Sequence, residues 1–411
     1  MGRIRNIKDV VEWGLCVGCG ICYYACDKDA ILLKNIYNQG IRPIVDSEKC
    51  TDDCRCLSFC PGLTVDAGLL KNDNFRQTEN DIYFGPALEI WEGYAQNDEI
   101  RFAASSGGLL TALSLYCLEK EDMSFVLHTG MNPDKPWENH TVQSRNKEEL
   151  ISRTGSRYAP ASPCDQLEMI QKSDRPCVFI GKPCDTTAVT MAKNQVPELD
   201  KKLGLILAFF CAGAPSVQGT LDMLSKFEIL PEQVNHLRYR GNGWPGGFHV
   251  IYDNNSKSKF LNYRESWHEL QKYRSFRCHL CPDGLGQISD LTCGDAWNRY
   301  SDNNDPGQSI VIVRTERGRT VLHKAMDQGY LNLKRIDHND VIAAQGLIAR
   351  KPEIFGRLMG MKALFVPIPK FIGFSLFRSW WRLGFIRKIQ TILGTMRRLI
   401  QRGFWHRKSY N

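Results

Sequence analysis

Short apolar runs alternate with longer segments of helical periodicity through the middle of the chain, between about residues 85 and 350. Runs of this length suit strands that are buried on both faces of a sheet. We expect four such strands, at Ser124–Gly130, Cys177–Gly181, Gly204–Phe210 and Ser309–Arg314. Helices are expected beside them at Asp185–Asn194, Pro215–Phe227 and Gly318–Asp327. This alternation predicts an α/β domain over residues 85–350 with a mainly parallel sheet.

A different pattern occupies residues 356–411, where aromatic and aliphatic residues alternate with arginine and lysine. Between Ser379 and Arg402 the apolar residues recur near helical spacing, at Trp381, Leu383, Phe385, Ile386, Ile389, Leu393, Met396 and Ile400. A basic amphipathic helical tail with Trp and Phe suits an anionic membrane surface. The alternative is a helix that docks on the body of the protein or on a partner subunit.

Charge and composition narrow the class of protein. After Glu353 the chain has twelve Lys and Arg and no Asp or Glu, so the preceding residues carry a net −4 of the total +8. This acidic body argues against nucleic acid as a partner. With 43% hydrophobic and 24% charged residues, the 411-residue chain suits two or three folded domains.

The cysteines bear on the compartment and the chemistry. The first ten residues lack the apolar run of a secretion signal, and no apolar run is long enough for a membrane-spanning helix. We therefore expect a cytoplasmic protein, which the tail is able to hold peripherally on the inner face of the membrane. Sixteen cysteines in that compartment indicate metal or cluster ligation in place of disulfides.

Eight cysteines lie close together near the N-terminus, in two four-cysteine motifs. These are Cys16-x2-Cys19-x2-Cys22-x3-Cys26 and Cys50-x3-Cys54-x-Cys56-x3-Cys60, with Pro61 after the second. In two-cluster ferredoxins, three close cysteines bind one cluster and the fourth binds the other. We therefore assign one 4Fe–4S cluster to Cys16, Cys19, Cys22 and Cys60, and a second to Cys50, Cys54, Cys56 and Cys26. The motifs predict an α+β ferredoxin-like module over residues 1–70; a zinc ribbon fits them poorly.

A second set of cysteines lies in the larger domain. Cys184 and Cys211 each follow an expected strand, so both should lie at the carboxyl edge of the sheet, where ligands bind in α/β folds. A Cys-x2-Cys pair, Cys278 and Cys281, follows later in the chain. Four thiolates are enough for a third 4Fe–4S cluster, with Cys293 as a reserve ligand. The alternative is that Cys184 and Cys211 only fill the core.

One segment suggests a phosphate-containing ligand. Ser105-Ser106-Gly107-Gly108 precedes the apolar run Leu109–Leu118. We expect the serines to cap a helix and the glycines to let a ligand approach the backbone, where the helix N-terminus favours a phosphate. A plain helix start is the alternative. Clusters move single electrons, and a flavin is the usual converter between them and two-electron substrates.

The larger domain resembles the beta subunit of coenzyme F420-reducing hydrogenases and dehydrogenases, from about Glu92 to Arg317. Five segments carry the resemblance: Ser105-Ser106-Gly107-Gly108-Leu109-Leu110-Thr111, Thr154-Gly155-Ser156-Arg157-Tyr158, Val178-Phe179-Ile180-Gly181-Lys182-Pro183-Cys184, Tyr239-Arg240-Gly241-Asn242-Gly243-Trp244-Pro245-Gly246, and Cys278-His279-Leu280-Cys281 through Gly294-Asp295-Ala296-Trp297. An added N-terminal ferredoxin module also occurs in this family.

The resemblance implies FAD and one 4Fe–4S cluster in the larger domain. It makes Cys184, Cys211, Cys278 and Cys281 the ligands of that cluster. It also implies that the flavin is lined by Ser105, Ser106, Gly107, Gly108, Thr111, Gly155, Ser156, Tyr158, Gly181 and Lys182. Many relatives have Gln after the Pro-Cys pair, where this chain has Asp185.

These inferences predict an iron–sulfur flavoprotein oxidoreductase. Its clusters would exchange electrons with a donor such as ferredoxin or a reduced deazaflavin, and its FAD with a two-electron organic substrate, within polysaccharide biosynthesis for example. The alternative is a non-catalytic electron-transfer subunit of a larger complex. No catalytic residue is assigned; His249 and His279 are proton donors by residue type alone.

Overall fold

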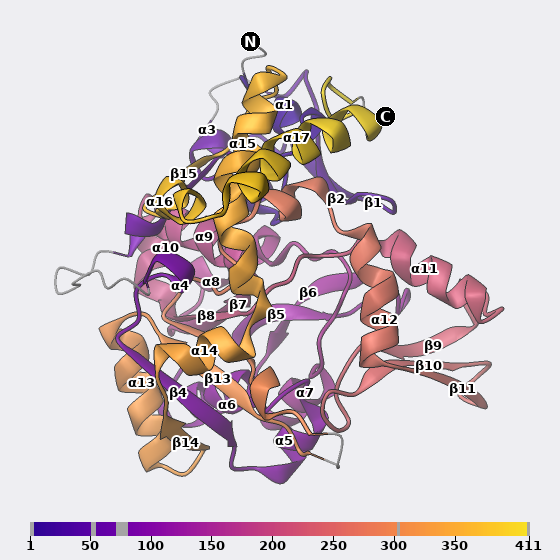
Figure 1. Cartoon of the computed structure of the whole chain (residues 1–411). Helices are drawn as coiled ribbons and strands as arrows, with labels where there is room; N and C mark the ends of the chain where they lie inside the picture. Colours follow the sequence, from indigo (N-terminus) through magenta and orange to yellow (C-terminus); the bar gives the residue numbers. More distant parts are fainter. Residues whose placement is uncertain (1–3, 51–54, 71–80, 302–304, 409–411) are drawn as a thin grey trace.

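The computed structural model describes residues 4–50, 55–70, 81–301 and 305–408. Its centre is an eight-stranded sheet with the strand order β14-β4-β13-β12-β8-β7-β5-β6 (Figure 1). In that order the strands are Leu331–Arg335, Glu89–Ala95, Ser309–Val313, Leu291–Asp295, Leu203–Phe209, Cys177–Gly181, Val126–Met131 and Asn139–Ser144. The four strands expected from the apolar runs are therefore all present, as β5, β7, β8 and β13.

The middle of the sheet is parallel and its edges are antiparallel. β12, β8, β7 and β5 pair parallel to one another, whereas β6, β13, β4 and β14 pair antiparallel to their neighbours. The predicted mainly parallel sheet is thus confirmed for its central strands, whose carboxyl ends meet at one edge. β13, which the apolar run marked as buried, runs antiparallel to both of its neighbours.

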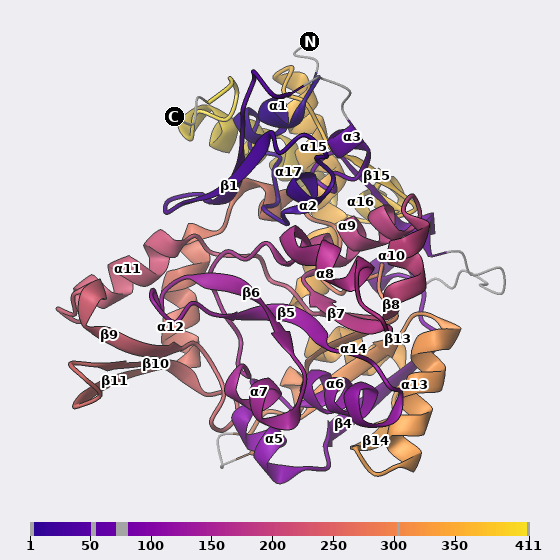
Figure 2. The same cartoon turned by 180° about the vertical axis from the view of Figure 1, so that it is seen from behind.

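Helices cover both faces of the sheet because successive strand residues point to opposite sides. On one face, Val178 and Leu205 pack with α6 (Leu109–Lys120), α7 (Lys147–Ser152) and α13 (Glu316–Asp327). On the other, Phe179 and Ile206 pack with α8 (Leu167–Gln171), α9 (Pro183–Lys193) and α10 (Pro197–Lys202). Figure 2 shows these two layers above and below the central strands. α4 (Asp81–Phe84), α5 (Asp98–Ala103) and α14 (His338–Ala344) complete the domain.

A second, smaller sheet lies beside the first and was not expected from the sequence. It is antiparallel, in the order β11-β10-β9, formed by Lys257–Asn262, Gly247–Tyr252 and Val234–Arg238. α11 (Val217–Lys226) and α12 (Tyr263–Leu270) pack against it around a core that includes Tyr239 and Phe248. This unit brings the residues that follow β9, including Arg240, to the main sheet.

The N-terminal segment shares a core with the larger domain. It comprises α1 (Ile7–Glu12), α2 (Ile21–Tyr24), β1 (Ile31–Ile36), β2 (Gly40–Val45), α3 (Arg55–Ser58) and β3 (Thr64–Asp66). Ile21 and Phe59 are buried among Leu167, Ile170 and Phe179 of the larger domain. The buried Ser162 hydroxyl also donates a hydrogen bond of 2.7 Å to the Gly18 carbonyl.

The C-terminal segment folds back onto the N-terminal one. Its elements are α15 (Ile354–Ala363), β15 (Lys370–Ile372), α16 (Leu376–Trp381) and α17 (Phe385–Gln401). β15 pairs parallel with β3, and the fully buried Leu399 of α17 shares a core with Val10 and Leu15. Both termini consequently lie at the same end of the molecule (Figure 1). No helix in the described ranges is long and apolar enough to cross a membrane.

Candidate functional site

A cavity of about 510 Å³ opens at the carboxyl edge of the central parallel strands. Its wall includes Gly181 at the end of β7, Phe209 at the end of β8 and Asp295 at the end of β12. Ligands in open α/β sheets bind at this edge, and the volume lies within the usual range for small-molecule and cofactor sites.

The N-terminus of α6 forms one wall of this cavity. Gly108 is the N-cap residue, with φ of 79° and no side-chain cap, and Leu109 to Thr111 face the cavity. A Cβ on Gly107 would stand 2.6 Å from the Gly93 carbonyl oxygen, so the approach to the helix needs glycine. Uncapped amides and the helix dipole at this point favour an anionic group such as a phosphate.

The two serines before α6 do not cap it, contrary to expectation. The Ser106 hydroxyl donates to the Gln308 carbonyl at 2.7 Å, and the Ser105 hydroxyl accepts from Ser156 at 3.0 Å. The reason is the left-handed turn at Gly108, which puts both serines ahead of the N-cap position. They join the start of α6 to two distant loops of the cavity wall instead.

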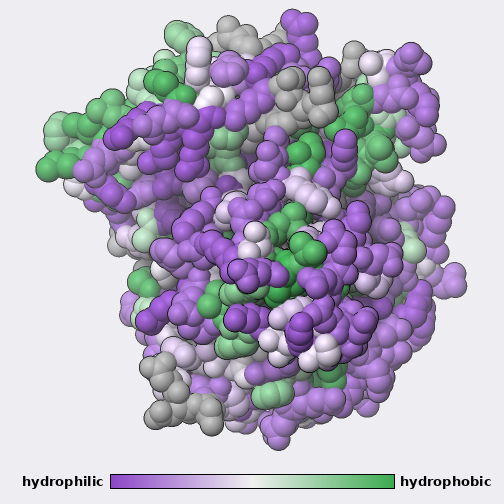
Figure 3. Space-filling model, turned by 90° about the vertical axis from the view of Figure 1, so that its right-hand side faces the viewer, coloured by the Kyte–Doolittle hydropathy of each residue, from purple (hydrophilic) through white to green (hydrophobic). Residues whose placement is uncertain are grey.

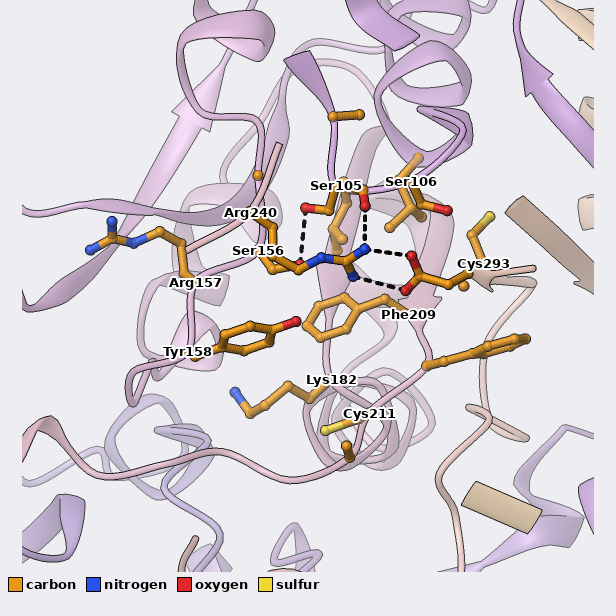
Figure 4. Close-up of a pocket in the computed structure, with 18 of the residues that line it drawn as sticks. Ser105, Ser106, Ser156, Arg157, Tyr158, Lys182, Phe209, Cys211, Arg240 and Cys293 are labelled. Atoms are coloured by element: carbon orange, nitrogen blue, oxygen red, sulfur yellow. Dashed lines mark hydrogen bonds and ion pairs between the residues drawn. The ribbon is translucent and has the colours of Figure 1, made fainter. Parts of the chain in front are cut away.

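An ion pair between the buried Arg240 and the half-buried Asp295 forms another wall of the cavity. Figure 4 labels Arg240 and marks its hydrogen bonds with dashed lines. The guanidinium donates to both carboxylate oxygens, at 2.9 and 2.6 Å, and also to the Ser105 carbonyl. It lies over the rings of Tyr263 and Trp297, at 4.6 and 5.1 Å from their centroids. Bidentate pairing and stacking together hold three chain segments in one geometry.

A second buried cation, Lys182, faces the cavity from the start of α9. Its ammonium pairs with Asp185 at 2.7 Å and donates to the Ala161 carbonyl at 3.2 Å. Burial lowers the pKa of Lys182, but the Asp185 carboxylate and the nearby Cys184 and Cys211 together raise it above its ordinary value, so the side chain is cationic. Figure 4 shows Lys182 with Tyr158 and Cys211 around the same part of the cavity.

His128 adds a neutral polar group to the wall. Burial, helped by the nearby Arg153 guanidinium, lowers the pKa of His128 to about 3. Its Nε2 lies 2.7 Å from the Ser144 hydroxyl, which also accepts from Arg153 at 2.7 Å. The imidazole is therefore uncharged near neutral pH and offers one donor and one acceptor to its surroundings.

Four cysteines of the larger domain come together beside the cavity. They are Cys184 in the first turn of α9, Cys211 after β8, and Cys278 and Cys281 in the turn around residues 276–280. Burial, followed by the nearby Cys278 thiol, raises the pKa of Cys211 to about 11. Burial also raises the pKa of Cys184 and Cys281, which both lie near Cys211. Cys211 lines the cavity as well, so one residue is common to the cavity and the thiol group.

A second thiol group forms in the N-terminal segment. Burial raises the pKa of Cys22 well above its ordinary value, and the neighbouring thiols of Cys16, Cys19 and Cys60 raise it further. Gly18 and Gly20 have φ of 73° and 85°, the left-handed turns that wrap the backbone around this group. The four cysteines that the motifs assigned to the first cluster are therefore gathered in the fold.

The expected second N-terminal cluster is only partly described. Cys54 lies outside the described residues. Cys56 lies near Cys22 and so borders the first group. Cys26 and Cys50 are half-buried, and their joint ligation with Cys56 stays a prediction.

Both gathered thiol groups offer the donor atoms that an iron–sulfur cluster needs. Among the residues that the structure describes, no group of three His, Cys, Asp or Glu side chains is arranged to hold one metal ion. Four buried thiols raise one another's pKa unless a cationic centre deprotonates them, and this donor set fits the 4Fe–4S clusters that the spacing predicts.

Cys164 lies between the N-terminal thiol group and the cavity. Its amide donates to the Cys19 carbonyl at 3.1 Å, and its thiol lies 3.6 Å from the Asp185 carbonyl oxygen. Burial, with the adjacent Cys19 thiol, raises the pKa of Cys164. No motif spacing links Cys164 to the other cysteines, and only the fold brings it beside Cys19.

The cavity gathers most of the residues expected to line a flavin. Of the ten, Ser105, Ser106, Gly108, Thr111, Gly155, Ser156, Tyr158, Gly181 and Lys182 face it, while Gly107 packs behind them against Gly93. Their role in holding FAD stays a prediction. Cys293 is a wall residue whose pKa is raised by burial and not by a neighbouring thiol. His249 and His279 do not line the cavity.

Several wall residues were not singled out by sequence reasoning. These are Arg240, Asp295, Tyr263, Trp297, His128 and Arg153. Arg240 and Asp295 stand inside two of the segments that carry the family resemblance, and that was the available signal. His128 and Arg153 belong to no sequence motif, and only the fold brings them to Ser144.

Comparison with known proteins agrees with this geometry. Residues 90–168 match the N-terminal family model of the coenzyme F420 hydrogenase/dehydrogenase beta subunit, and residues 174–339 match the C-terminal model of the same protein. Together the two matched regions span more than half of the chain.

Curated relatives have low identity over long regions. The chain is 21% identical to a coenzyme F420-dependent sulfite reductase of Methanocaldococcus jannaschii, over 81% of the chain but 49% of that protein. It is 24% identical to coenzyme F420 hydrogenase subunit beta of Methanosarcina barkeri, over 62% of the chain and 85% of the relative. It is 21% identical to a subunit of the F(420)H(2) dehydrogenase of Methanosarcina mazei, over 79% of the chain and 86% of the relative. The chain thus spans only about half the length of the first of these relatives.

A solved structure shares the fold. A chain of the F420-reducing [NiFe] hydrogenase complex from Methanosarcina barkeri superposes with a TM-score of 0.53 at 20% identity, covering 69% of this chain and 96% of that one. The named relatives are F420-linked oxidoreductases or their subunits. The chain belongs to the coenzyme F420 hydrogenase/dehydrogenase beta subunit family.

Proposed function

We propose that the protein is an iron–sulfur flavoprotein oxidoreductase that links ferredoxin-type clusters to FAD and to a two-electron substrate. The observation that carries this proposal is Cys211, which belongs both to the cavity wall and to the group of four thiols. A cofactor in the cavity and a cluster on those thiols would then be neighbours. When bound, clusters supply single-electron transfer and a flavin converts it to two-electron chemistry.

In this proposal each thiol group has one cluster to hold. Cys184, Cys211, Cys278 and Cys281 would hold the cluster of the larger domain, and Cys16, Cys19, Cys22 and Cys60 the first N-terminal one. Cys26, Cys50, Cys54 and Cys56 are proposed for the remaining cluster on the basis of their spacing alone.

The cavity residues have separable tasks toward FAD. The uncapped start of α6 would bind phosphate, with Ser105 and Ser156 bracing the loops around it. Lys182 supplies a fixed positive charge where an anionic ring or phosphate would be stabilised. The aromatic rings of Tyr158, Tyr263 and Trp297 offer apolar area that excludes water from the site.

The substrate and donor are proposed from the relatives. Their names include coenzyme F420, which favours a deazaflavin as the two-electron partner. Ferredoxin remains the proposed single-electron donor, because the N-terminal thiols carry the ferredoxin spacing. A place in polysaccharide biosynthesis rests on the family resemblance alone.

The second candidate is a non-catalytic electron-transfer subunit. Two relatives are named as subunits, and the solved relative belongs to a complex. Purification from the native host without an affinity step on a partner separates the two candidates. Stoichiometric partner chains would favour the subunit role, whereas a lone chain that turns over F420 would favour the enzyme.

Anaerobic purification with counts of iron, acid-labile sulfide and released flavin tests the main proposal. We expect about twelve irons, from three four-iron clusters, and one FAD per chain. The Cys211→Ala variant should lose about four of the irons, whereas Cys293→Ala, a buried thiol of the same wall, should keep them all. An oxygen-free preparation without iron would contradict the cluster assignment, and normal iron without FAD would contradict the flavin assignment alone.

The cytoplasm is the proposed compartment, because it keeps thiols reduced and so available as cluster ligands. Peripheral attachment to the inner face of the membrane would bring the enzyme to that surface through its C-terminal segment.

A further inference from the structure

The C-terminal segment turns large apolar side chains toward solvent. Ten of the eighteen large hydrophobic residues that are exposed in the described structure come from this short part of the chain. They are Phe365, Ile372, Phe377, Trp381, Phe385, Ile386, Ile389, Leu393, Ile400 and Trp405. Scattered single exposed residues need no explanation, but a concentration of this kind marks an interaction surface.

The exposed residues of α17 form one continuous stripe. Phe385, Ile389 and Leu393 follow one another at intervals of four, and Ile386, Leu393 and Ile400 at intervals of seven, so all five lie on the same side of the helix. Phe385 is 76% exposed and Ile386 72% exposed. We call these five residues the apolar stripe. Figure 3 shows exposed apolar side chains gathered on a projecting edge of the molecule, at the upper left.

The opposite side of α17 is already fully packed. Thr391, Thr395 and Leu399 are its buried residues, and Thr391 and Thr395 face α15. A Cβ on Gly356 would stand 1.9 Å from the Thr391 hydroxyl oxygen, and one on Gly360 would stand 2.6 Å from the Ile392 carbonyl oxygen. Two glycines one turn apart thus let the helices touch closely, as small residues do between membrane helices.

This packing is the reverse of an ordinary surface helix. Such a helix buries its large apolar residues and exposes its polar ones. In α17, threonines face the body while phenylalanine, isoleucine and leucine face outward. The fold is therefore complete without the apolar stripe, which remains available for another surface.

The charge around the stripe selects the kind of surface. The chain after Glu353 carries twelve basic residues and no acidic one. Arg387 pairs with Glu353, and Arg407 with Asp9 and Glu12. Arg397 is exposed on the same helix as the stripe, and Arg402 is exposed at its C-cap. An apolar stripe with a basic border complements lipid chains below anionic headgroups.

We propose that α16 and α17 dock the protein on an anionic lipid bilayer, with the apolar stripe in the headgroup region and α17 parallel to the surface. Trp381 and Trp405 are exposed as well and suit the headgroup region, because Trp is favoured at membrane interfaces. A second copy is disfavoured, since a two-fold contact through this face would set basic residues against basic residues. A nucleic acid would leave the apolar stripe without a partner.

Flotation of the holoprotein with vesicles tests this docking directly. We expect binding to vesicles that contain phosphatidylglycerol, little binding to pure phosphatidylcholine, and weaker binding at high salt. Phe385→Glu should lower binding by roughly tenfold or more, because it removes a large apolar side chain and adds a negative charge. The matched control is Phe260→Glu on β11, where the phenylalanine is 59% exposed and far from the stripe in sequence.

A charge variant separates headgroup attraction from apolar insertion. Arg397→Gln should weaken binding about fivefold, the effect of one basic residue near such a surface, and Lys257→Gln on β11 should not. Iron content and the unfolding midpoint confirm that each variant is folded. These readouts do not depend on the proposed FAD or F420 chemistry, so docking and function are tested apart.

Three results would overturn the proposal. The first is no flotation with anionic vesicles at low salt. The second is a holoprotein homodimer that Phe385→Glu converts to a monomer, which would assign the stripe to a second copy. The third is equal loss of flotation for Phe385→Glu and Phe260→Glu, which would show that the stripe has no special part in binding.

Discussion

At the scale of single residues, Arg240 connects several parts of the cavity wall. Its buried guanidinium donates hydrogen bonds to Asp295 and to the Ser105 carbonyl, and it also stacks on two aromatic rings. Removing one partner of a buried ion pair leaves the other charged and unpaired, and that costs more than the pair contributes.

Arg240→Leu should therefore lower the free energy of unfolding by about 3–5 kcal/mol and abolish retention of the FAD proposed for the cavity. The matched control is Arg335→Gln, which breaks an exposed contact of 3.8 Å to Glu89 and should cost less than about 1 kcal/mol. Chemical unfolding of both variants, with released flavin as the second readout, measures the difference. Similar losses in the two variants would contradict the role given to Arg240.

His128 should make the protein sensitive to acid. Its pKa is about 3 in the fold and near 6.5 in the unfolded chain, so between these values the unfolded state binds the additional proton. Above pH 6.5 His128 does not lower the free energy of unfolding. As the pH falls below that value the free energy of unfolding decreases, by about 2 kcal/mol at pH 5. His128→Gln should remove this part of the loss, and the exposed His406→Gln should not. Urea unfolding of the two variants and the unchanged protein, at neutral pH and at pH 5, measures the difference.

At the scale of elements, sequence patterns succeeded where structure is local. Buried strands such as β7 and β8 consist of continuous apolar residues, and the sequence predicted both within a residue of their bounds. β11 was missed because its residues, from Lys257 to Asn262, are almost all exposed and show no apolar alternation. The cap expected from Ser105 and Ser106 failed because a glycine with positive φ follows them.

The contact of α2 with the larger domain depends on Gly20. A Cβ there would stand 3.0 Å from the Asp165 amide nitrogen and from the Ser162 carbonyl oxygen, and its φ is 85°. Gly329 has a similar φ of 75° but no atom within 4 Å of a Cβ, so Gly329→Ala measures the backbone penalty alone, about 1–2 kcal/mol. Gly20→Ala should destabilise the protein more than this and lower its iron content. Equal unfolding midpoints for the two variants would show that α2 can move away without cost.

At the scale of the whole molecule, segments of different composition share hydrophobic cores. The sequence predicted an N-terminal ferredoxin-like module and a basic tail from their compositions, and left open whether the tail docks on the body. In the fold, Phe59 enters the core of the larger domain, and β15 extends the N-terminal strand β3. Such contacts join segments that are distant in sequence, and no local pattern records which distant segment will be the partner.

Leu399 tests whether the two ends of the chain stabilise each other. It is fully buried in a core that also contains Val10 and Leu15, while Leu393 of the same helix is 57% exposed. Leu399→Ala should cost about 2–5 kcal/mol through the cavity it leaves, and Leu393→Ala should stay within about 0.5 kcal/mol. Because the core is shared, hydrogen exchange should quicken in α1 of the N-terminal segment as well as in α17. Faster exchange confined to α17 would mean that the tail opens independently of the N-terminal thiol group.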